Sequence, residues 1–205
     1  MIAGKRVNML WKFPSIPYRF LPNSPFLCNM TLTQKIVDTI RDVPDFPKPG
    51  ILFKDITPLL KNPGLCREIT REMANRLANQ QIDAIAAVES RGFLFGMMLA
   101  NELNIPFIPV RKSGKLPYKT IGYEYSLEYG TAKVEIHTDA VQPGWNVLIH
   151  DDLLATGGTA AAAAELVLAS GGTVAGFAFL VTLEFLNGKQ YLSKYSNSCW
   201  ELVSY

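Results

Sequence analysis

The sequence predicts an α/β fold in which helices cover both faces of a twisted, mainly parallel sheet. From about residue 31 onward, short apolar segments of strand length alternate with segments of helical periodicity, a pattern typical of parallel strands joined by right-handed crossover helices. Two of the apolar segments, 82–88 and 145–149, each run into a short polar turn before a helix. Ligands bind at such carboxyl ends of strands, so the fold also predicts where a site lies.

The first periodic segment follows Thr31. Apolar residues predict one face of a short helix that Pro44 ends: Ile36, Val37, Ile40 and Val43. Residues 45–50 are rich in proline and read as a loop. A second helix is indicated by apolar residues that recur every four positions: Leu65, Ile69, Met73 and Leu77.

The middle of the chain alternates strand and helix. Residues 82–88 form a short, apolar, predicted strand, residues 93–103 a buried helix and residues 105–110 the next strand. Residues 111–130 are polar and contain several lysines, glycines and tyrosines, and the segment after them alternates apolar and polar residues. We expect a mobile loop or a ribbon there.

Strand 145–149 precedes the glycine-rich turn, and an alanine-rich helix over 160–169 follows it. Gly171 and Gly172 come where a helix end is expected. Residues 174–183 predict another apolar strand.

Composition limits the class of protein. The 205 residues, 48% hydrophobic, suffice for one α/β domain. No apolar run reaches the ~18 residues that a membrane span needs, so we expect no membrane partner. Three cysteines lie far apart and the chain has two histidines, which excludes a zinc cluster and an obvious disulfide framework. They indicate reduced thiols of a cytoplasmic protein.

Charge is distributed unevenly along the chain. Residues 1–29 carry four basic residues and no acid, which leaves 16 basic against 18 acidic residues in the remainder. The body therefore lacks a basic footprint for nucleic acid. Residues 1–29 are also rich in proline and aromatic residues and show no helical periodicity. We interpret them as a disordered or loosely docked extension to a domain that spans 30–205, with a targeting peptide as the alternative.

The most informative motif runs from Asp151 to Thr159, where an apolar strand ends in two acids and a turn of small residues. Gly157 and Gly158 let the backbone approach a phosphate closely, and the N-terminus of the following helix adds free N–H donors. Threonine hydroxyls can donate further hydrogen bonds, and the acids can accept them from ribose hydroxyls. The motif predicts a site for a phosphorylated sugar. A structural turn with an incidental acidic pair is the alternative.

A second loop, Glu89-Ser90-Arg91-Gly92-Phe93, repeats this arrangement after strand 82–88. If the two strands are neighbours, both loops face one crevice. Arg91 can then hold a diphosphate through two parallel hydrogen bonds. A surface arginine that caps a turn is the alternative.

Two further segments complete a resemblance: Phe46–Pro58, which reads FPKPGILFKDITP, and Tyr125–Gly130, which reads YSLEYG. Together with the two loops, in this order, they resemble the adenine phosphoribosyltransferase family of type I phosphoribosyltransferases, from about Thr31 to the end of the chain. Hypoxanthine-guanine and orotate enzymes share the sugar-phosphate turn but usually lack the segment like Tyr125–Gly130.

The resemblance implies a type I phosphoribosyltransferase fold with a small hood and a flexible catalytic loop. It implies transfer of the phosphoribosyl group from 5-phosphoribosyl 1-diphosphate to adenine, giving AMP and diphosphate. It further implies Mg²⁺ held mainly through substrate and water with no direct protein ligand, and a homodimer. Small-molecule substrates are then the partners, with neither nucleic acid nor membrane.

The resemblance also implies residue roles. The ribose and 5-phosphate would be bound by Asp151, Asp152, Ala155, Thr156, Gly157, Gly158 and Thr159. The diphosphate would be bound by Glu89, Ser90, Arg91, Arg111, Lys112 and Lys115. Adenine would contact Phe53, Lys54 and Leu183, with Lys54 acting through its backbone. The catalytic set would be Glu128, Arg91 and Tyr129. Members often carry a cis peptide in the diphosphate loop, which corresponds here to Glu89-Ser90.

Glu128 is our choice for the group that shares a proton with the purine, since a loop can close over the base. A solvated carboxylate is the alternative, as is a solvated charged face for the lysines of 112–119. His150 is expected to be half-buried in its strand, with a contact to Asp151 as an option, and His137 to be exposed.

Three rival functions differ from this hypothesis in what they require of the sequence. Another phosphoribosyltransferase would differ only in its base, such as hypoxanthine, guanine or xanthine. A ligand-sensing regulator would need a DNA-reading domain, for which residues 1–29 lack two periodic helices. A nucleotide-dependent oxidoreductase would need the glycine fingerprint of a dinucleotide site, which the sequence lacks.

Overall fold

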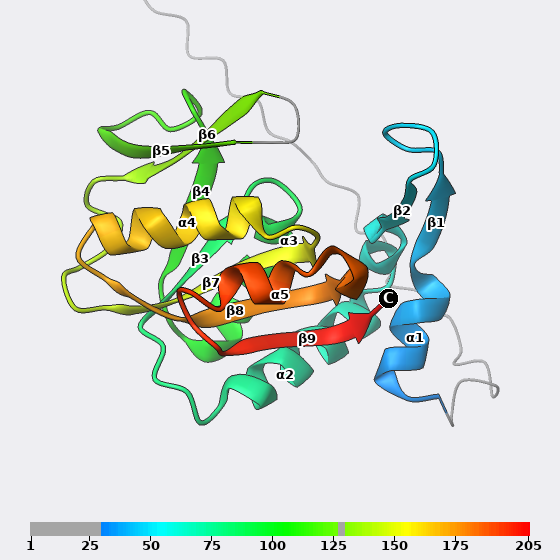
Figure 1. Cartoon of the computed structure of the whole chain (residues 1–205). Coiled ribbons are helices and arrows are strands. Elements are labelled where there is room, and N and C mark those ends of the chain that lie inside the picture. Colours follow the sequence, from blue (N-terminus) through cyan, green and yellow to red (C-terminus); the bar gives the residue numbers. More distant parts are fainter. Residues whose placement is uncertain (1–29, 127–129) are drawn as a thin grey trace, which may run out of the picture. The chain divides into compact units, whose positions relative to one another are not determined.

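The computed structural model describes residues 30–126 and 130–205 (Figure 1). The expected extension, residues 1–29, lies outside the described residues, as do Leu127, Glu128 and Tyr129. The elements follow in this order: α1 Leu32–Thr39, β1 Arg41–Pro44, β2 Leu52–Asp55, the 3-10 helix η2 Thr57–Lys61, α2 Pro63–Leu77, β3 Ala84–Val88, α3 Gly92–Leu103, β4 Phe107–Lys112, β5 Thr120–Ser126, β6 Thr131–His137, β7 Asn146–Leu154, α4 Gly158–Ala169, β8 Thr173–Thr182, the 3-10 helix η3 Glu184–Leu186, α5 Gly188–Leu192 and β9 Cys199–Ser204.

A mainly parallel sheet forms the centre of the domain, as predicted. Its strand order is β5-β6-β4-β3-β7-β8-β9. The five strands from β4 to β9 in this order are mutually parallel. The ribbon of β5 and β6 joins antiparallel to β4 (Figure 1). None of the helices among the described residues is long and apolar enough to cross a membrane.

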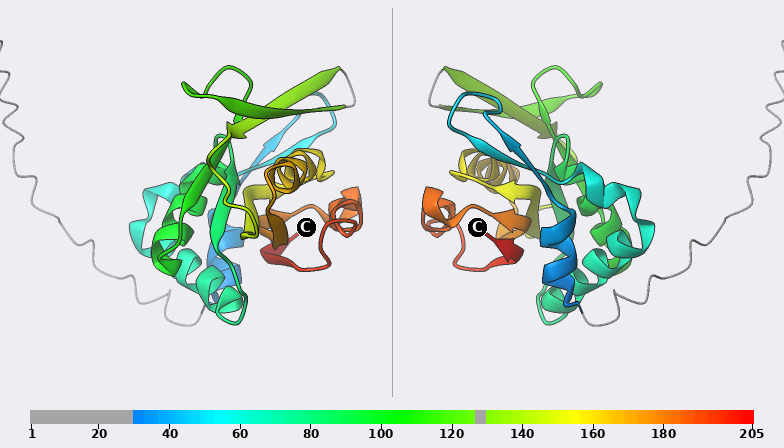
Figure 2. Two further views of the ribbon diagram at one scale, coloured as in Figure 1. Left: turned by 90° about the vertical axis from the view of Figure 1, so that its left-hand side faces the viewer. Right: turned by 90° about the vertical axis from the view of Figure 1, so that its right-hand side faces the viewer.

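Helices cover both faces of this sheet, which also agrees with the prediction. Alternate residues of β3 point to opposite faces: Ala84 and Ala86 belong to the core cluster that contains α4, whereas Ile85 belongs to the cluster that contains α1, α2 and α3. The side views in Figure 2 show helices flanking the sheet on either side. Both strand faces are therefore buried, which explains why β3 reads as a continuous apolar run.

The first predicted helix is shorter than its apolar pattern suggested. It ends at Thr39, and Arg41–Pro44 instead forms β1, paired antiparallel with β2. Because a residue before proline is pushed out of the helical region, Val43 favours an extended backbone. The ladder with β2 then supplies partners for the backbone groups that a longer helix would have used.

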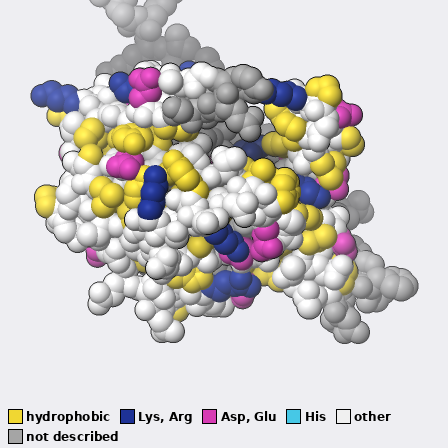
Figure 3. Space-filling model, in the orientation of Figure 1, with side chains coloured by type: hydrophobic (Ala, Val, Ile, Leu, Met, Phe, Trp, Pro, Cys, Tyr) yellow, Lys and Arg dark blue, Asp and Glu magenta, His cyan; other side chains and the backbone are white. Residues whose placement is uncertain are grey.

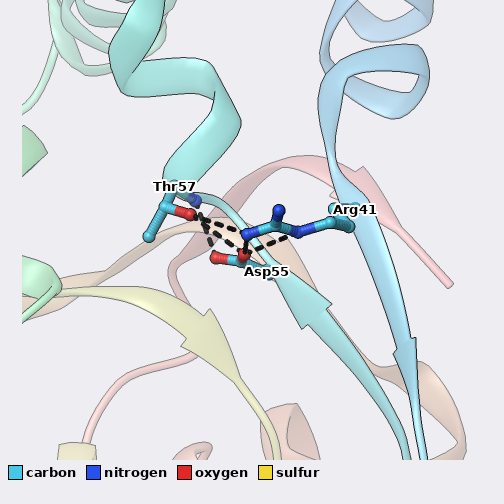
Figure 4. Close-up of polar contacts among 3 residues, drawn as sticks. All are labelled: Arg41, Asp55 and Thr57. Carbon is cyan, nitrogen blue, oxygen red and sulfur yellow. Dashed lines mark hydrogen bonds and ion pairs between the residues drawn. The ribbon is translucent and has the colours of Figure 1, made fainter.

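The β1–β2 hairpin is fastened at its base by Asp55 (Figure 4). The Asp55 carboxylate accepts hydrogen bonds from the Arg41 guanidinium, from the Thr57 backbone N–H at 2.9 Å and from the Thr57 hydroxyl at 2.9 Å. Burial alone would raise the pKa of Asp55, but these hydrogen bonds outweigh it and lower the pKa to about 2. The end of β2 is thus fixed next to Phe53 and Lys54.

The strand before the glycine-rich turn is longer than predicted. β7 reaches Leu154 because β8 continues to pair with it as far as Leu154 and Thr182. β3 pairs with β7 only as far as Ala87 and His150, so Asp151 and Asp152 follow the last residue pair of these two strands. Strand β9, which pairs parallel with β8, and the short helix α5 were not predicted from the sequence.

Both histidines differ from expectation. His150 is fully buried in β7 rather than half-buried, and its Nδ1 lies 2.8 Å from the Ala178 carbonyl oxygen. Burial lowers the pKa of His150 to about 4, against the effect of this backbone hydrogen bond, so the imidazole is neutral at pH 7. His137 is half-buried rather than exposed, with its ring centroid 6.2 Å from that of Tyr118.

Candidate active site

The two polar loops found in the sequence meet at the carboxyl ends of β3 and β7. A pocket of about 280 Å³ lies there, at the sheet edge where parallel α/β proteins bind ligands. It is lined by Glu89, Ser90, Arg91, Lys112, Asp151 and Asp152. The Glu89-Ser90 peptide bond is cis, as the resemblance implied. Residues from three neighbouring strands therefore face one cavity.

Arg91 occupies the centre of this arrangement. Its Nε atom lies 2.7 Å from Oδ2 of Asp152, a side chain that is almost fully buried. Its guanidinium carbon lies 4.9 Å from the centroid of the Phe53 ring on β2. Arg91 thus links the acidic end of β7 with the β1–β2 hairpin, and through it Phe53 lies next to a residue that lines the pocket.

The two acids of the pocket, Asp151 and Asp152, are held by different contacts. Asp151 Oδ1 accepts a hydrogen bond from the Asp152 backbone N–H at 2.8 Å. Burial, followed by the adjacent Asp152 charge, raises the pKa of Asp151 well above its ordinary value. Gly92, at the start of α3, packs so closely here that a Cβ atom would lie 2.8 Å from Asp151 Oδ1. The carboxylate oxygens of Asp151 and Asp152 can therefore accept hydrogen bonds on a side of the pocket that Gly92 packs tightly.

The glycine-rich turn lies between β7 and α4. Gly157 takes a positive φ of 87°, and no side chain caps the N-terminus of α4. The first backbone N–H groups of α4 are therefore left for an anion. Ala155 is half-buried, Thr156 is exposed, and Gly158 and Thr159 begin the helix. The Tyr125 hydroxyl donates to Thr159 Oγ1 at 3.2 Å, which joins the β5–β6 ribbon to this turn.

The basic residues of the predicted diphosphate set lie at the end of β4. Arg111 Nε is 3.0 Å from Glu89 Oε2, and Arg111 Nη1 donates to the Lys115 carbonyl at 3.0 Å. Lys112 reaches the pocket lining, whereas Lys115 is exposed and does not line it. Glu89 therefore acts as a partner of Arg111 in this structure.

The structure brings only some of the residues predicted to contact the base close to the pocket. Phe53 is half-buried and lies edge-on to Phe46, with ring centroids 5.1 Å apart. The Lys54 side chain is buried, with Nζ 2.7 Å from Asp42 Oδ1 and 3.9 Å from the Tyr205 ring centroid. Its ammonium group is thereby engaged, which agrees with a role through the backbone.

Leu183 follows β8 and is half-buried, and its backbone N–H donates to the Leu154 carbonyl at 2.9 Å. Glu128 and Tyr129 belong to the link between β5 and β6 and lie outside the described residues.

Two polar residues near the site were not singled out from the sequence. Tyr125 belongs to the YSLEYG segment, which could have drawn attention to it. Glu135 looked like one of the polar residues that alternate with Val134 and Ile136, yet it is buried. Over the described surface shown in Figure 3, basic and acidic side chains are interspersed rather than gathered into a basic patch.

Comparisons with known proteins agree with this geometry. Residues 55–204 match the family model of the phosphoribosyl transferase domain. The adenine phosphoribosyltransferase of Cytophaga hutchinsonii is 54% identical over 174 residues, which cover 85% of this chain and 96% of that protein. That of Nitrosococcus oceani is 52% identical over 163 residues, covering 80% of this chain and 95% of that protein.

Solved structures show the same relationship. The adenine phosphoribosyltransferase of Thermoanaerobacter pseudethanolicus superposes with a TM-score of 0.81 at 50% identity, covering 84% of this chain and 99% of that chain. The enzyme of Saccharomyces cerevisiae, solved with an imino-altritol bisphosphate and adenine, gives a TM-score of 0.77 at 39% identity, covering 83% and 98%. The chain therefore belongs to the phosphoribosyltransferase family, with the type I fold and among the adenine phosphoribosyltransferases.

Proposed function

We propose that the protein transfers the 5-phosphoribosyl group from 5-phosphoribosyl 1-diphosphate to adenine, giving AMP and diphosphate in purine salvage. The observation that carries this proposal is the pocket at the ends of β3 and β7, where Arg91 lies between the buried Asp152 and the Phe53 ring. Adenine phosphoribosyltransferases with about half of their residues identical support adenine as the base. The reaction is a pentosyl transfer (EC 2.4.2.7).

The uncapped N-terminus of α4 is proposed to bind the 5-phosphate. Backbone N–H groups of residues 155–159 would donate to the phosphate, and the Thr156 and Thr159 hydroxyls would add two donors, which the uncapped start of α4 supports. The positive end of the helix dipole favours the phosphate charge. The ribose hydroxyls would then fall beside Asp151 and Asp152, whose oxygens can accept from them.

Departure of the diphosphate leaves positive charge on the sugar carbon and adds negative charge to the leaving group. Fixed cations lower the cost of that negative charge because they need no reorganisation during the reaction. We assign this role to Arg91, Arg111, Lys112 and Lys115, together with donors of the Glu89-Ser90 loop. Since Arg91 already lies against Phe53, it would connect the diphosphate site with the residue proposed to stack on the base.

Magnesium is proposed as the cofactor. Mg²⁺ prefers carboxylate and phosphate oxygens and keeps several waters, and the oxygens of Asp151 and Asp152 in the pocket could accept hydrogen bonds from those waters. These residues fit an ion held mainly through the diphosphate and water. When bound, the ion supplies further neutralisation of the diphosphate charge.

On the base side, Phe53 would stack on the purine and the Lys54 backbone would face its polar edge, with Leu183 completing the contact. Glu128 is proposed to share a proton with the purine ring, and Tyr129 to support the loop and the sugar. Exclusion of water by that loop would protect the reacting sugar carbon from hydrolysis.

We further propose a catalytic domain over residues 30–205, supported by the family match over 55–204. A homodimer is proposed because two large apolar side chains of α3, Leu94 and Met97, are 41% and 53% exposed. Light scattering would test it. A cytoplasmic location is proposed from the free thiols of Cys66 and Cys199, and cell fractionation would test that.

The decisive experiment measures diphosphate release with adenine, hypoxanthine, guanine and orotate, each with and without magnesium. We expect release with adenine that depends on magnesium. Activity with hypoxanthine and not adenine would favour the rival of different base specificity. Binding of 5-phosphoribosyl 1-diphosphate without release for any base would favour the ligand-sensing regulator.

A further inference from the structure

Glu135 is a buried acid that does not line the pocket. It lies on β6 between two buried apolar residues, and only 7% of its surface is exposed. An isolated carboxylate in such a place is costly, and an apolar side chain would fill the position at lower cost. The partners of its oxygens therefore indicate what the acid does there.

Both oxygens of Glu135 are used by one short turn. The Ser113 hydroxyl donates to Oε1 at 2.5 Å, and the Gly114 backbone N–H donates to Oε2 at 3.1 Å. The hydrogen bond from Ser113 lowers the pKa of Glu135 most and that from Gly114 next. They act against burial and together with smaller contributions from Lys133 and the Thr120 hydroxyl. The ammonium of Lys133 is more distant, 3.8 Å from Oε1. Glu135 is thus charged and directed at the Ser113–Gly114 corner.

This corner joins the cations of the proposed diphosphate site. Lys115 N–H donates to the Lys112 carbonyl at 3.3 Å, and Gly114 takes a φ of 77°, as the third position of a type II turn requires. Arg111 spans the same turn, with Nη1 bonded to the Lys115 carbonyl at 3.0 Å. The turn therefore sets the direction of Arg111, Lys112 and Lys115 relative to the pocket.

We propose that Glu135 is a positioning residue for the diphosphate site: from β6 it holds the Ser113–Gly114 corner, and through that corner it aims Lys112 and Arg111 at the leaving group. The inference rests on the proposed function, because it takes the pocket to hold a diphosphate. Glu135 itself touches no substrate in this scheme.

The test is Glu135→Gln in the full chain, titrated with inorganic diphosphate in the presence of magnesium. The neutral amide offers one acceptor oxygen for two donors, so one hydrogen bond of the turn is lost. We expect diphosphate affinity to fall about tenfold, and the KM for adenine to change by less than about twofold. Glu165→Gln is the matched control. Glu165 lies on α4, and its carboxylate accepts a hydrogen bond from the Tyr195 hydroxyl at 2.5 Å. The diphosphate affinity of this variant should stay at the wild-type value.

Ser113→Ala provides a second variant that removes a donor from the other side of the same contact. It should also weaken diphosphate binding. The double variant should bind more weakly than either single variant, but its fold-loss of affinity should be smaller than the product of the two single losses. This pair also covers the case in which Glu135→Gln does not fold.

The inference is overturned if Glu135→Gln and Ser113→Ala fold and bind diphosphate as the wild type does. It is also overturned if Glu135→Gln weakens adenine and diphosphate equally, as general destabilisation would. Wild-type protein that binds diphosphate but uses another base would refute the proposed function and leave the inference intact.

Discussion

The Asp55 cluster at the base of the β1–β2 hairpin makes stability depend on pH. Replacing Asp55 by Asn removes the charge that Arg41 and Thr57 solvate, while keeping the size of the side chain (Figure 4). The pKa of Asp55 falls from 3.8 to about 2 in the folded protein. At roughly 1.4 kcal/mol per pKa unit, the ionised carboxylate contributes about 2 kcal/mol to the free energy of unfolding.

The sign of the pH dependence follows from the lowered pKa. The contribution is fully present above the unfolded-state value of 3.8 and is lost as pH falls toward the folded-state value of about 2. Asp55→Asn should therefore lower the free energy of unfolding by about 2 kcal/mol at pH 7, and by only about 1 kcal/mol at pH 3.

Urea denaturation at several pH values measures this difference directly. The control is Glu68→Gln, which removes an ion pair of 2.8 Å with Lys35 whose acid is 50% exposed; it should cost less than about 1 kcal/mol at either pH. A loss for Asp55→Asn that does not change between pH 7 and pH 3 would refute the reasoning, as would a loss no larger than that of the control.

Three further outcomes are expected from variants of the site. Arg91→Lys keeps the charge but loses the planar donor pair and the contact with the Phe53 ring, so KM for 5-phosphoribosyl 1-diphosphate should rise at least about tenfold in steady-state kinetics; an unchanged KM would contradict this role. Tyr125→Phe should weaken ribose 5-phosphate binding about threefold by calorimetry, and should have no such effect in a Thr159→Val background. Glu128→Gln should reduce turnover far more than it weakens binding of 5-phosphoribosyl 1-diphosphate, and equal turnover would remove Glu128 from the mechanism.

The parallel core was predictable because burial on two faces leaves a plain mark in the sequence. β3 is apolar at every position and α2 repeats apolar residues every four positions, and both elements are where the pattern indicated. The end of the first helix was predicted too late. Val43 continues the helical pattern, although the proline after it favours an extended backbone. β9 was missed, and its pairing with β8 depends on a long-range contact that local periodicity does not report.

The pocket lining was predictable for a different reason. Small residues and charges directly after apolar strands indicate loops at a sheet edge, so the Glu89–Arg91 loop and the Asp151–Asp152 pair could be placed together in advance. Contacts between loops could not be foreseen. The Arg91 contact with Phe53 joins residues from separate motifs, and Glu135 was hidden because an exposed and a buried acid look alike in an alternating strand.

The alanine run of α4 places a constraint on how this protein can change. Ala160 to Ala164 are all buried, with at most 4% of any residue exposed. Because consecutive residues of a helix point in different directions, these methyl groups let β5, β7 and β8 pack closely around α4. A wider side chain at any of the five positions would displace the helix. This displacement would move the backbone N–H groups at the N-terminus of α4 away from the ligand. Larger side chains at these positions should therefore first lower the affinity for an anion.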